Sequence, residues 1–194
     1  MYSHRVNLMD ESSRPMVAQS DREAMRHALD EARAALAFDD VPVGAVVLDE
    51  AGAIIGRGRN EREKHHDPTA HAEVVALREA AALRGTWQLS GCSLVVTLEP
   101  CVLCAGAIVA ARISRVVFGA WDVKAGAAGS VVDLLRERRL PHRVAEVLGG
   151  VDEAECASLL AEYFAGKRGP VPPESTGHQK TLSAVVTSDK PPAA

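Results

Sequence analysis

The chain has 194 residues, of which 47% are hydrophobic and 25% charged, and its formal net charge is −4. This composition is ordinary for a globular protein, and the small negative charge does not by itself indicate a nucleic-acid partner. The longest apolar stretch, residues 101–111, is shorter than the roughly 20 residues needed to cross a bilayer, and residues 1–15 hold no apolar signal-peptide segment. We therefore expect a cytoplasmic protein with no membrane partner.

The predicted elements begin after residues 1–19, which are polar and aperiodic and which we expect to form a mobile extension. Ser20 followed by Glu23 is a capping-box pattern, and the helical spacing of the apolar residues behind it predicts an amphipathic helix over about 20–37. Two short apolar runs separated by turn residues then predict a β-hairpin, with strands at 43–48 and 53–58.

Helices and strands alternate after this hairpin. A polar loop runs to His66, and Asp67-Pro68 predicts the N-terminus of a helix that Gly85 ends. The remaining expected elements are a strand at 93–98, a helix from Pro100 to about Arg112, a strand at 115–119, a short helix near 131–137, a strand at 143–148 and a last helix from the cap residue Asp152 to about 165. This order predicts an α/β sandwich whose later strands are parallel. Residues 169–194, rich in Pro, Ser and Thr, predict a disordered tail.

Basic residues gather in two places although the total charge is negative. One cluster is Arg57, Arg59, Arg62 and Lys64, and the other is Arg136, Arg138, Arg139 and Arg143, whereas acids concentrate over 146–162. A basic face that binds a nucleic acid is compatible with the negative net charge of the chain. The alternative is that both clusters are ordinary solvated surface charges.

Two short segments, His71-Ala72-Glu73 and Pro100-Cys101-Val102-Leu103-Cys104, carry the residues with metal chemistry. The two cysteines are three residues apart at a predicted helix N-terminus, so they share a face where thiolates are favoured. With the imidazole of His71 they form a nitrogen/sulfur set that suits zinc and leaves a fourth position for water. Glu73 is the natural proton shuttle for that water. Since an ideal helix does not aim His71 and Glu73 at one point, we infer that the site lies over the helix end.

Other interpretations of these residues remain open. Cys101 and Cys104 alone are also the pattern of a redox pair. A structural zinc site would need a fourth ligand, for which His65, His66 and Cys92 are present. Cys156 recurs with apolar residues at helical spacing, so we expect it in the core.

The two segments make the chain resemble the cytidine deaminase superfamily, whose signature is a His-Ala-Glu segment followed by Pro-Cys-x-x-Cys. Longer strings are similar to the bacterial tRNA-specific adenosine deaminases, in collinear order over residues 20–168. These strings are residues 41–45, Asn60, and residues 66–73, 97–107, 116–120 and 126–130.

The resemblance implies a three-layer α-β-α sandwich with a five-stranded mixed sheet, in a homodimer, with a deaminase domain over 20–168. It implies zinc-dependent hydrolytic deamination of the wobble adenosine to inosine in the anticodon of an arginine tRNA, so that the anticodon stem-loop is the expected partner. By motif match, the zinc ligands would be His71, Cys101 and Cys104, the general acid/base Glu73, and the substrate contacts Asn60 and the backbone of Ala72.

Two other functions share parts of this pattern. A guanine or cytosine-type deaminase acting on free bases or nucleosides has the same motifs, but the loop at 126–130 and the basic residues of 57–64 favour RNA. A zinc-stabilised RNA-binding module without catalysis would have no need of Glu73. Trp121 departs from the family pattern, and it would stack on a nucleotide or pack on a dimer partner.

Overall fold

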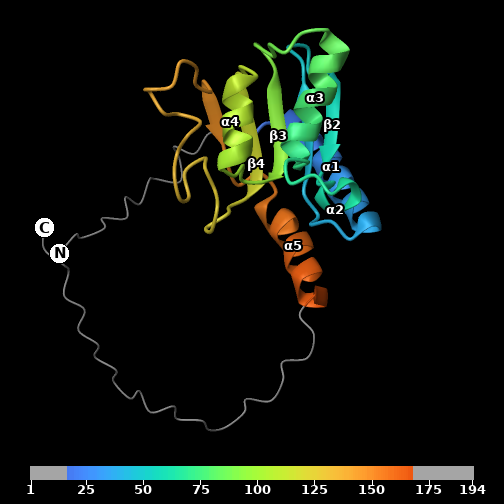
Figure 1. The fold of residues 1–194 in the computed structure, drawn as a ribbon. Coiled ribbons are helices and arrows are strands. Elements are labelled where there is room, and N and C mark those ends of the chain that lie inside the picture. The colour runs from blue at the N-terminus through green and yellow to red at the C-terminus, as the bar shows by residue number, and fades with distance from the viewer. Residues whose placement is uncertain (1–16, 168–194) are drawn as a thin grey trace, which may run out of the picture.

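The computed structural model describes residues 17–167 (Figure 1). Most of the expected N-terminal extension at 1–19 and the whole expected tail at 169–194 lie outside the described residues. None of the described helices is long and apolar enough to cross a membrane. The elements are α1 (Gln19–Ala35), the 3-10 helix η2 (Leu36–Phe38), β1 (Gly44–Leu48), β2 (Ile54–Arg59), α2 (Arg62–His65), α3 (Ala72–Arg84), β3 (Ser93–Leu98), α4 (Val102–Ala110), β4 (Arg115–Ala120), β5 (Glu146–Leu148) and α5 (Glu153–Lys167).

The five strands form one mixed sheet in the order β2-β1-β3-β4-β5. Strand β1 is antiparallel to both β2 and β3, and its Val46 lies opposite Val95 of β3. Strands β3, β4 and β5 are parallel, with Val95 opposite Val117 of β4. The predicted hairpin and the predicted parallel arrangement of the later strands are confirmed.

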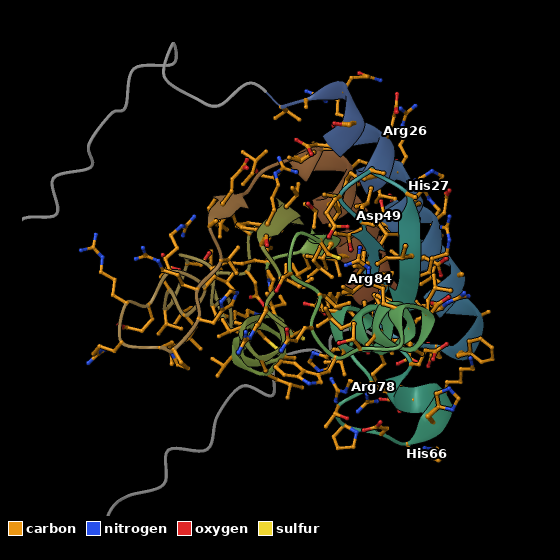
Figure 2. All side chains as sticks on the ribbon, turned by 90° about the horizontal axis from the view of Figure 1, so that it is seen from above. Arg26, His27, Asp49, His66, Arg78 and Arg84 are labelled. Carbon is orange, nitrogen blue, oxygen red and sulfur yellow. The ribbon has the colours of Figure 1, made fainter. Side chains whose placement is uncertain are left out.

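Helices cover both faces of this sheet, because its strands are apolar on both sides. On one face, α1 and α5 pack over Val46, Val95 and Val117, and Cys156 of α5 belongs to this core as expected. Helices α3 and α4 pack together on the other face, as Figure 1 shows. Polar side chains of α1, such as Arg26 and His27, project away from the sheet (Figure 2). The predicted three-layer α-β-α sandwich is thus confirmed.

Glycine at position 58 lets α3 lie directly against β2. A Cβ atom on Gly58 would come 2.1 Å from the carbonyl oxygen of Ala72, the first residue of α3. No larger residue fits without moving the helix, since that contact is with backbone rather than with a flexible side chain. The first turn of α3, where Glu73 lies, is therefore placed by this close approach.

Two predicted helix starts are wrong. Ala18, not Ser20, is the N-cap of α1, because the N–H groups of Asp21 and Arg22 bond to its carbonyl, and no capping box forms. Asp67 does not begin α3, because its carboxylate accepts the N–H (2.8 Å) and hydroxyl (2.7 Å) of Thr69 and so closes a separate turn. Helix α3 begins at Ala72 instead.

The predicted short helix near 131–137 is also wrong. Its backbone groups bond mainly to other segments: the N–H of Leu134 donates to Ala127 O (3.0 Å), and Leu135 O accepts from Val144 N–H (2.9 Å). Within the segment, the N–H of Glu137 donates to Leu134 O at 3.4 Å, which is a single turn and not a helix. Strand β5 is shorter than predicted and begins at Glu146. The short helix α2 lies in the segment that the sequence predicts as a polar loop.

Candidate metal centre and substrate pocket

The N-termini of α3 and α4 lie together near the C-terminal end of β3, and each carries side chains of types that bind metals. His71 is the N-cap residue of α3, Cys101 is the N-cap residue of α4, and Cys104 lies in the first turn of α4. The Nδ1 atom of His71 lies 3.4 Å from the Sγ of Cys104 and 3.6 Å from the Sγ of Cys101. All three ligand atoms lie within 4.8 Å of one another. This nitrogen/sulfur set fits zinc.

The part of the chain that the structure describes adds no fourth ligand to this group. Within residues 17–167 the three side chains form the only group placed to hold a metal. His65 pairs instead with Glu61 (Nε2 to Oε2, 3.3 Å), and Cys92 is buried in the core between the sheet and the α3–α4 layer. The centre is therefore an open three-ligand set, and the described residues do not support a structural zinc site closed by His65, His66 or Cys92.

The ionised thiol of Cys101 favours a cation at this centre. The hydrogen bond from the Cys104 thiol, with a further contribution from His71, lowers the pKa of Cys101 to about 3, whereas the same bond raises the pKa of Cys104. The Cys101 thiolate in turn raises the pKa of the His71 imidazole. The pair of sulfurs thus carries a negative charge at a helix N-terminus, next to the nitrogen ligand.

Glu73 lines the same pocket as His71 and Cys101. The residue is only 4% exposed, and this burial raises the pKa of its carboxyl to about 7. His71 has an extended backbone (φ −72°, ψ 152°), so it is not part of the helical turn that holds Glu73. For this reason the two side chains reach one pocket although ideal helical geometry would separate them.

The pocket beside the metal centre has a volume of about 200 Å³. Asn60 lies in its wall, is 7% exposed, and has a side-chain Oδ1 that accepts no hydrogen bond from the described residues. A buried acceptor without a partner is unfavourable, so the arrangement suits a ligand that donates to it. The lining residues are Val41, Val43, Asn60, Arg62, His71, Ala72, Glu73, Leu98, Glu99, Cys101, Asp122 and Ala125.

Several of these lining residues were missed by reasoning from residue types. Leu98 and Glu99 come from the end of β3, and Asp122 and Ala125 from the loop after β4. The signal that could have found Leu98 and Glu99 is their place in the string 97–107, just before Pro100 and the candidate metal ligand Cys101. Trp121 does not line the pocket; its ring packs edge-on against Phe118 of the same chain, with ring centroids 4.7 Å apart.

The basic cluster at 57–64 is mostly neutralised. Arg59 pairs with Glu31 (Nη2 to Oε2, 2.8 Å), Arg57 reaches the same carboxylate at 3.8 Å, and Lys64 pairs with Glu61 at 2.7 Å. Arg62 lines the pocket and has no acidic partner within residues 17–167. In the second cluster, Arg136 and Arg139 pair with Asp133 and Glu137.

Known proteins share this fold and these motifs. The family described as the cytidine and deoxycytidylate deaminase zinc-binding region matches residues 18–120. The tRNA-specific adenosine deaminase of Bacillus subtilis (strain 168) is 46% identical over 140 residues, which cover 72% of this chain and 86% of that protein. A solved structure from studies of A-to-I editing by tRNA:A34 deaminases at the wobble position of transfer RNA has a TM-score of 0.68 and 42% identity, covering 71% of this chain and 99% of the other. Guanine deaminase from Nitrosomonas europaea has a TM-score of 0.65 at 27% identity, covering 78% of this chain and 87% of the other.

Proposed function

Because the chain belongs to the zinc-dependent cytidine and deoxycytidylate deaminase family, and within it to the tRNA-specific adenosine deaminases, we propose that it converts the wobble adenosine to inosine in the anticodon of an arginine tRNA. One observation carries the proposal: an open His71–Cys101–Cys104 set and the buried carboxyl of Glu73 line one pocket. A closed structural site would need no such carboxyl, so this arrangement speaks against a purely zinc-stabilised binding module.

The reaction adds water at C6 of adenine and releases ammonia. His71, Cys101 and Cys104 would hold the zinc ion, which would supply Lewis-acid activation of the attacking water. Glu73 accepts the proton from the attacking water and delivers it to N1 of the ring. With the C6–O bond formed, Glu73 next accepts the second proton from the new C6 hydroxyl and passes it to the amino group, which leaves as ammonia when the C6–N bond breaks. The product is inosine.

The pocket residues next to the centre hold the nucleoside. We assign Asn60 to a hydrogen bond with the substrate, because its buried Oδ1 has no partner within the described residues. Ala72, the first residue of α3, is assigned through its backbone N–H, which the helix itself leaves without an acceptor. Both assignments agree with the family resemblance of these positions.

The choice of RNA over a free base rests on the relatives. The named tRNA deaminases are 42–46% identical, whereas the guanine deaminase structure is 27% identical. A base in an anticodon loop is already unpaired, so its extrusion into the pocket costs less than flipping a base out of a duplex. Arginine tRNA and the wobble position are the finer parts of the proposal, and cytoplasmic tRNA processing follows from them.

We also propose that the enzyme is a homodimer, with the deaminase domain over residues 20–168. Val102 and Leu103 of α4 and Trp87 after α3 are large apolar side chains that are 42–58% exposed. Trp87 lines an apolar hollow between α3 and α4, and Trp87 and Val102 line a second one between α4 and residues 134–142. A second copy of the chain would cover this face. Light scattering of the zinc-loaded protein is expected to give the mass of two chains. The mass of one chain at micromolar concentration would contradict the proposed dimer.

A substrate panel tests the proposed function. The zinc-loaded protein is incubated with an arginine tRNA anticodon stem-loop carrying a wobble adenosine, with a stem-loop carrying the adenosine elsewhere, and with free adenosine, cytidine and guanine. We expect turnover of the first substrate only. Turnover of guanine or cytidine without turnover of the stem-loop would assign the chain to the free-base deaminases instead.

A further inference from the structure

Glu99 is a buried carboxylate that the proposed reaction does not use. It follows the last residue of β3, stands two residues before the metal ligand Cys101, and is only 2% exposed. An ionised group buried to this extent needs compensation by partners. Within residues 17–167 no basic side chain forms an ion pair with Glu99, so the compensation comes from hydrogen bonds.

Among the described residues, the hydrogen-bond donors to the Glu99 carboxylate all belong to one loop, residues 122–130. The backbone N–H of Asp122 donates to Oε2 at 3.0 Å, and those of Ala128 and Ser130 donate to Oε1, each at 3.0 Å. The Ser130 hydroxyl donates to Oε2 as well. The carboxylate therefore lies inside the loop and binds both of its ends.

Gly126 shows how closely the loop is folded on this carboxylate. A Cβ atom at Gly126 would lie 2.3 Å from Oε2 of Glu99. Glycine is thus needed where the loop passes over the acid. This contact gives a physical reason for the glycine at position 126. The sequence alone assigns no role to that glycine.

The same loop forms one wall of the pocket through Asp122 and Ala125. We propose that Glu99 is a positioning residue, whose carboxylate sets the place of the 122–130 loop and thereby the fit of the substrate nucleoside against this wall. The inference rests on the proposed function for its substrate, but the position of the loop can be measured without any substrate.

Other contacts keep the loop attached when the carboxylate is changed. The N–H of Ala127 donates to Pro100 O at 2.8 Å, and the Arg136 guanidinium donates to Ala128 O at 3.1 Å. The replacement Glu99→Gln keeps the size of the side chain but turns one acceptor oxygen into an N–H₂ group that faces loop donors. We therefore expect the loop to shift and loosen while the domain stays folded.

The test compares wild type and Glu99→Gln, both loaded with zinc, by hydrogen exchange and by steady-state kinetics. We expect the amides of Asp122, Ala128 and Ser130 to exchange at least about tenfold faster in the variant, with zinc content unchanged. With the stem-loop substrate we expect KM to rise about tenfold and kcat to change by less than about threefold, since Glu73 and the metal ligands are not moved.

Two matched variants sharpen the test. Ser130→Ala removes a single donor and is expected to raise KM and the exchange rate by less than Glu99→Gln does. Glu79→Gln, a carboxylate that accepts the Arg57 N–H at 2.9 Å away from the pocket, is expected to change neither. Should Glu99→Gln not fold, Ser130→Ala decides by the same two readouts.

Unchanged amide exchange over 122–130 in Glu99→Gln would overturn the proposal. A fall in kcat with unchanged KM would also overturn it, because it would place Glu99 in the chemical step. If the wild type did not deaminate the stem-loop, the proposed function would fail, and the exchange comparison alone would still decide whether Glu99 holds the loop.

Discussion

His71 and Glu73 are two residues apart in the chain, yet their side chains line one pocket because α3 begins between them. The N-cap residue His71 has an extended backbone and Glu73 stands in the first helical turn. A single chain segment therefore brings the proposed metal ligand and the proposed proton shuttle to the same pocket. Cys101, the N-cap residue of the neighbouring helix α4, faces His71 from the N-terminus of that helix.

Removal of zinc is expected to expose one reactive thiol in the folded protein. Cys101, whose pKa is lowered to about 3, would react with iodoacetamide only after chelation. Cys104 is 0% exposed and its hydrogen bond with Cys101 raises its pKa, so it is expected to stay unlabelled. Cys92 and Cys156 are 0% and 1% exposed, and burial raises the pKa of both thiols, that of Cys156 to about 12. Mass spectrometry of peptides after a short labelling pulse, with and without chelator, checks this. Labelling of Cys101 in the zinc-loaded protein would contradict its role as a ligand.

Arg62 is expected to contact an RNA phosphate, whereas Arg59 is not. Arg62 is exposed at the pocket and lacks an acidic partner within residues 17–167, but Arg59 is held by Glu31. Replacing Arg62 with alanine should reduce the slope of log K against log salt concentration for stem-loop binding by about one. Arg59→Ala is the matched control and should keep the wild-type slope. Equal slopes in the wild type and both variants would show that Arg62 does not contact a phosphate.

Asn60→Ala is expected to weaken substrate binding without loss of stability. The Asn60 Oδ1 is buried and accepts no hydrogen bond from the described residues, so its removal costs the folded protein no such bond. Loss of one hydrogen bond to the substrate corresponds to a rise in KM of up to about tenfold. Kinetics together with thermal denaturation checks both parts. A large fall in Tm with unchanged KM would make Asn60 a structural residue.

Gly58→Ala is expected to destabilise the fold and to weaken zinc binding together. The added Cβ would lie 2.1 Å from Ala72 O and push away the first turn of α3, at a cost of about 1–3 kcal/mol. Gly166→Ala on α5 is the control, because nothing lies within 4 Å of its Cβ, and it should be neutral or stabilising by up to about 1 kcal/mol. Urea denaturation and competitive zinc titration measure the two effects. Wild-type zinc affinity in a destabilised Gly58→Ala protein would show that Gly58 stabilises the fold but does not place the metal ligands.

Much of the fold could be predicted from local patterns. Apolar runs and turn residues predicted the hairpin of β1 and β2 and the strand β3, and helical periodicity predicted α1. The prediction of a helix at 131–137 was wrong because those residues bond to Ala127 and Val144, which no local pattern reveals. Asp67 was mistaken for a helix cap because the same carboxylate chemistry also closes a turn around Thr69.

Part of the candidate site could likewise be predicted from local sequence patterns, and part could not. The spacing of Cys101 and Cys104 at a helix start indicated a metal site, because the helix N-terminus favours thiolates whatever the rest of the fold is. The site roles assigned by resemblance stay proposals. The positioning role proposed for Glu99 could not be predicted from the sequence, because its partners lie 23 to 31 residues further along the chain and are mostly backbone N–H groups. Arg59 and Arg62 look alike in sequence, but in the structure Arg59 pairs with Glu31 whereas Arg62 lines the pocket.

The most direct measurement is inosine formation in a synthetic arginine tRNA anticodon stem-loop with a wobble adenosine, using zinc-loaded wild type and Glu73→Ala side by side. We predict inosine with the wild type and none with Glu73→Ala, although the variant keeps its fold and its zinc. Inosine at the wild-type rate from Glu73→Ala would remove this residue from the mechanism. No inosine from the zinc-loaded wild type would contradict the proposed function itself.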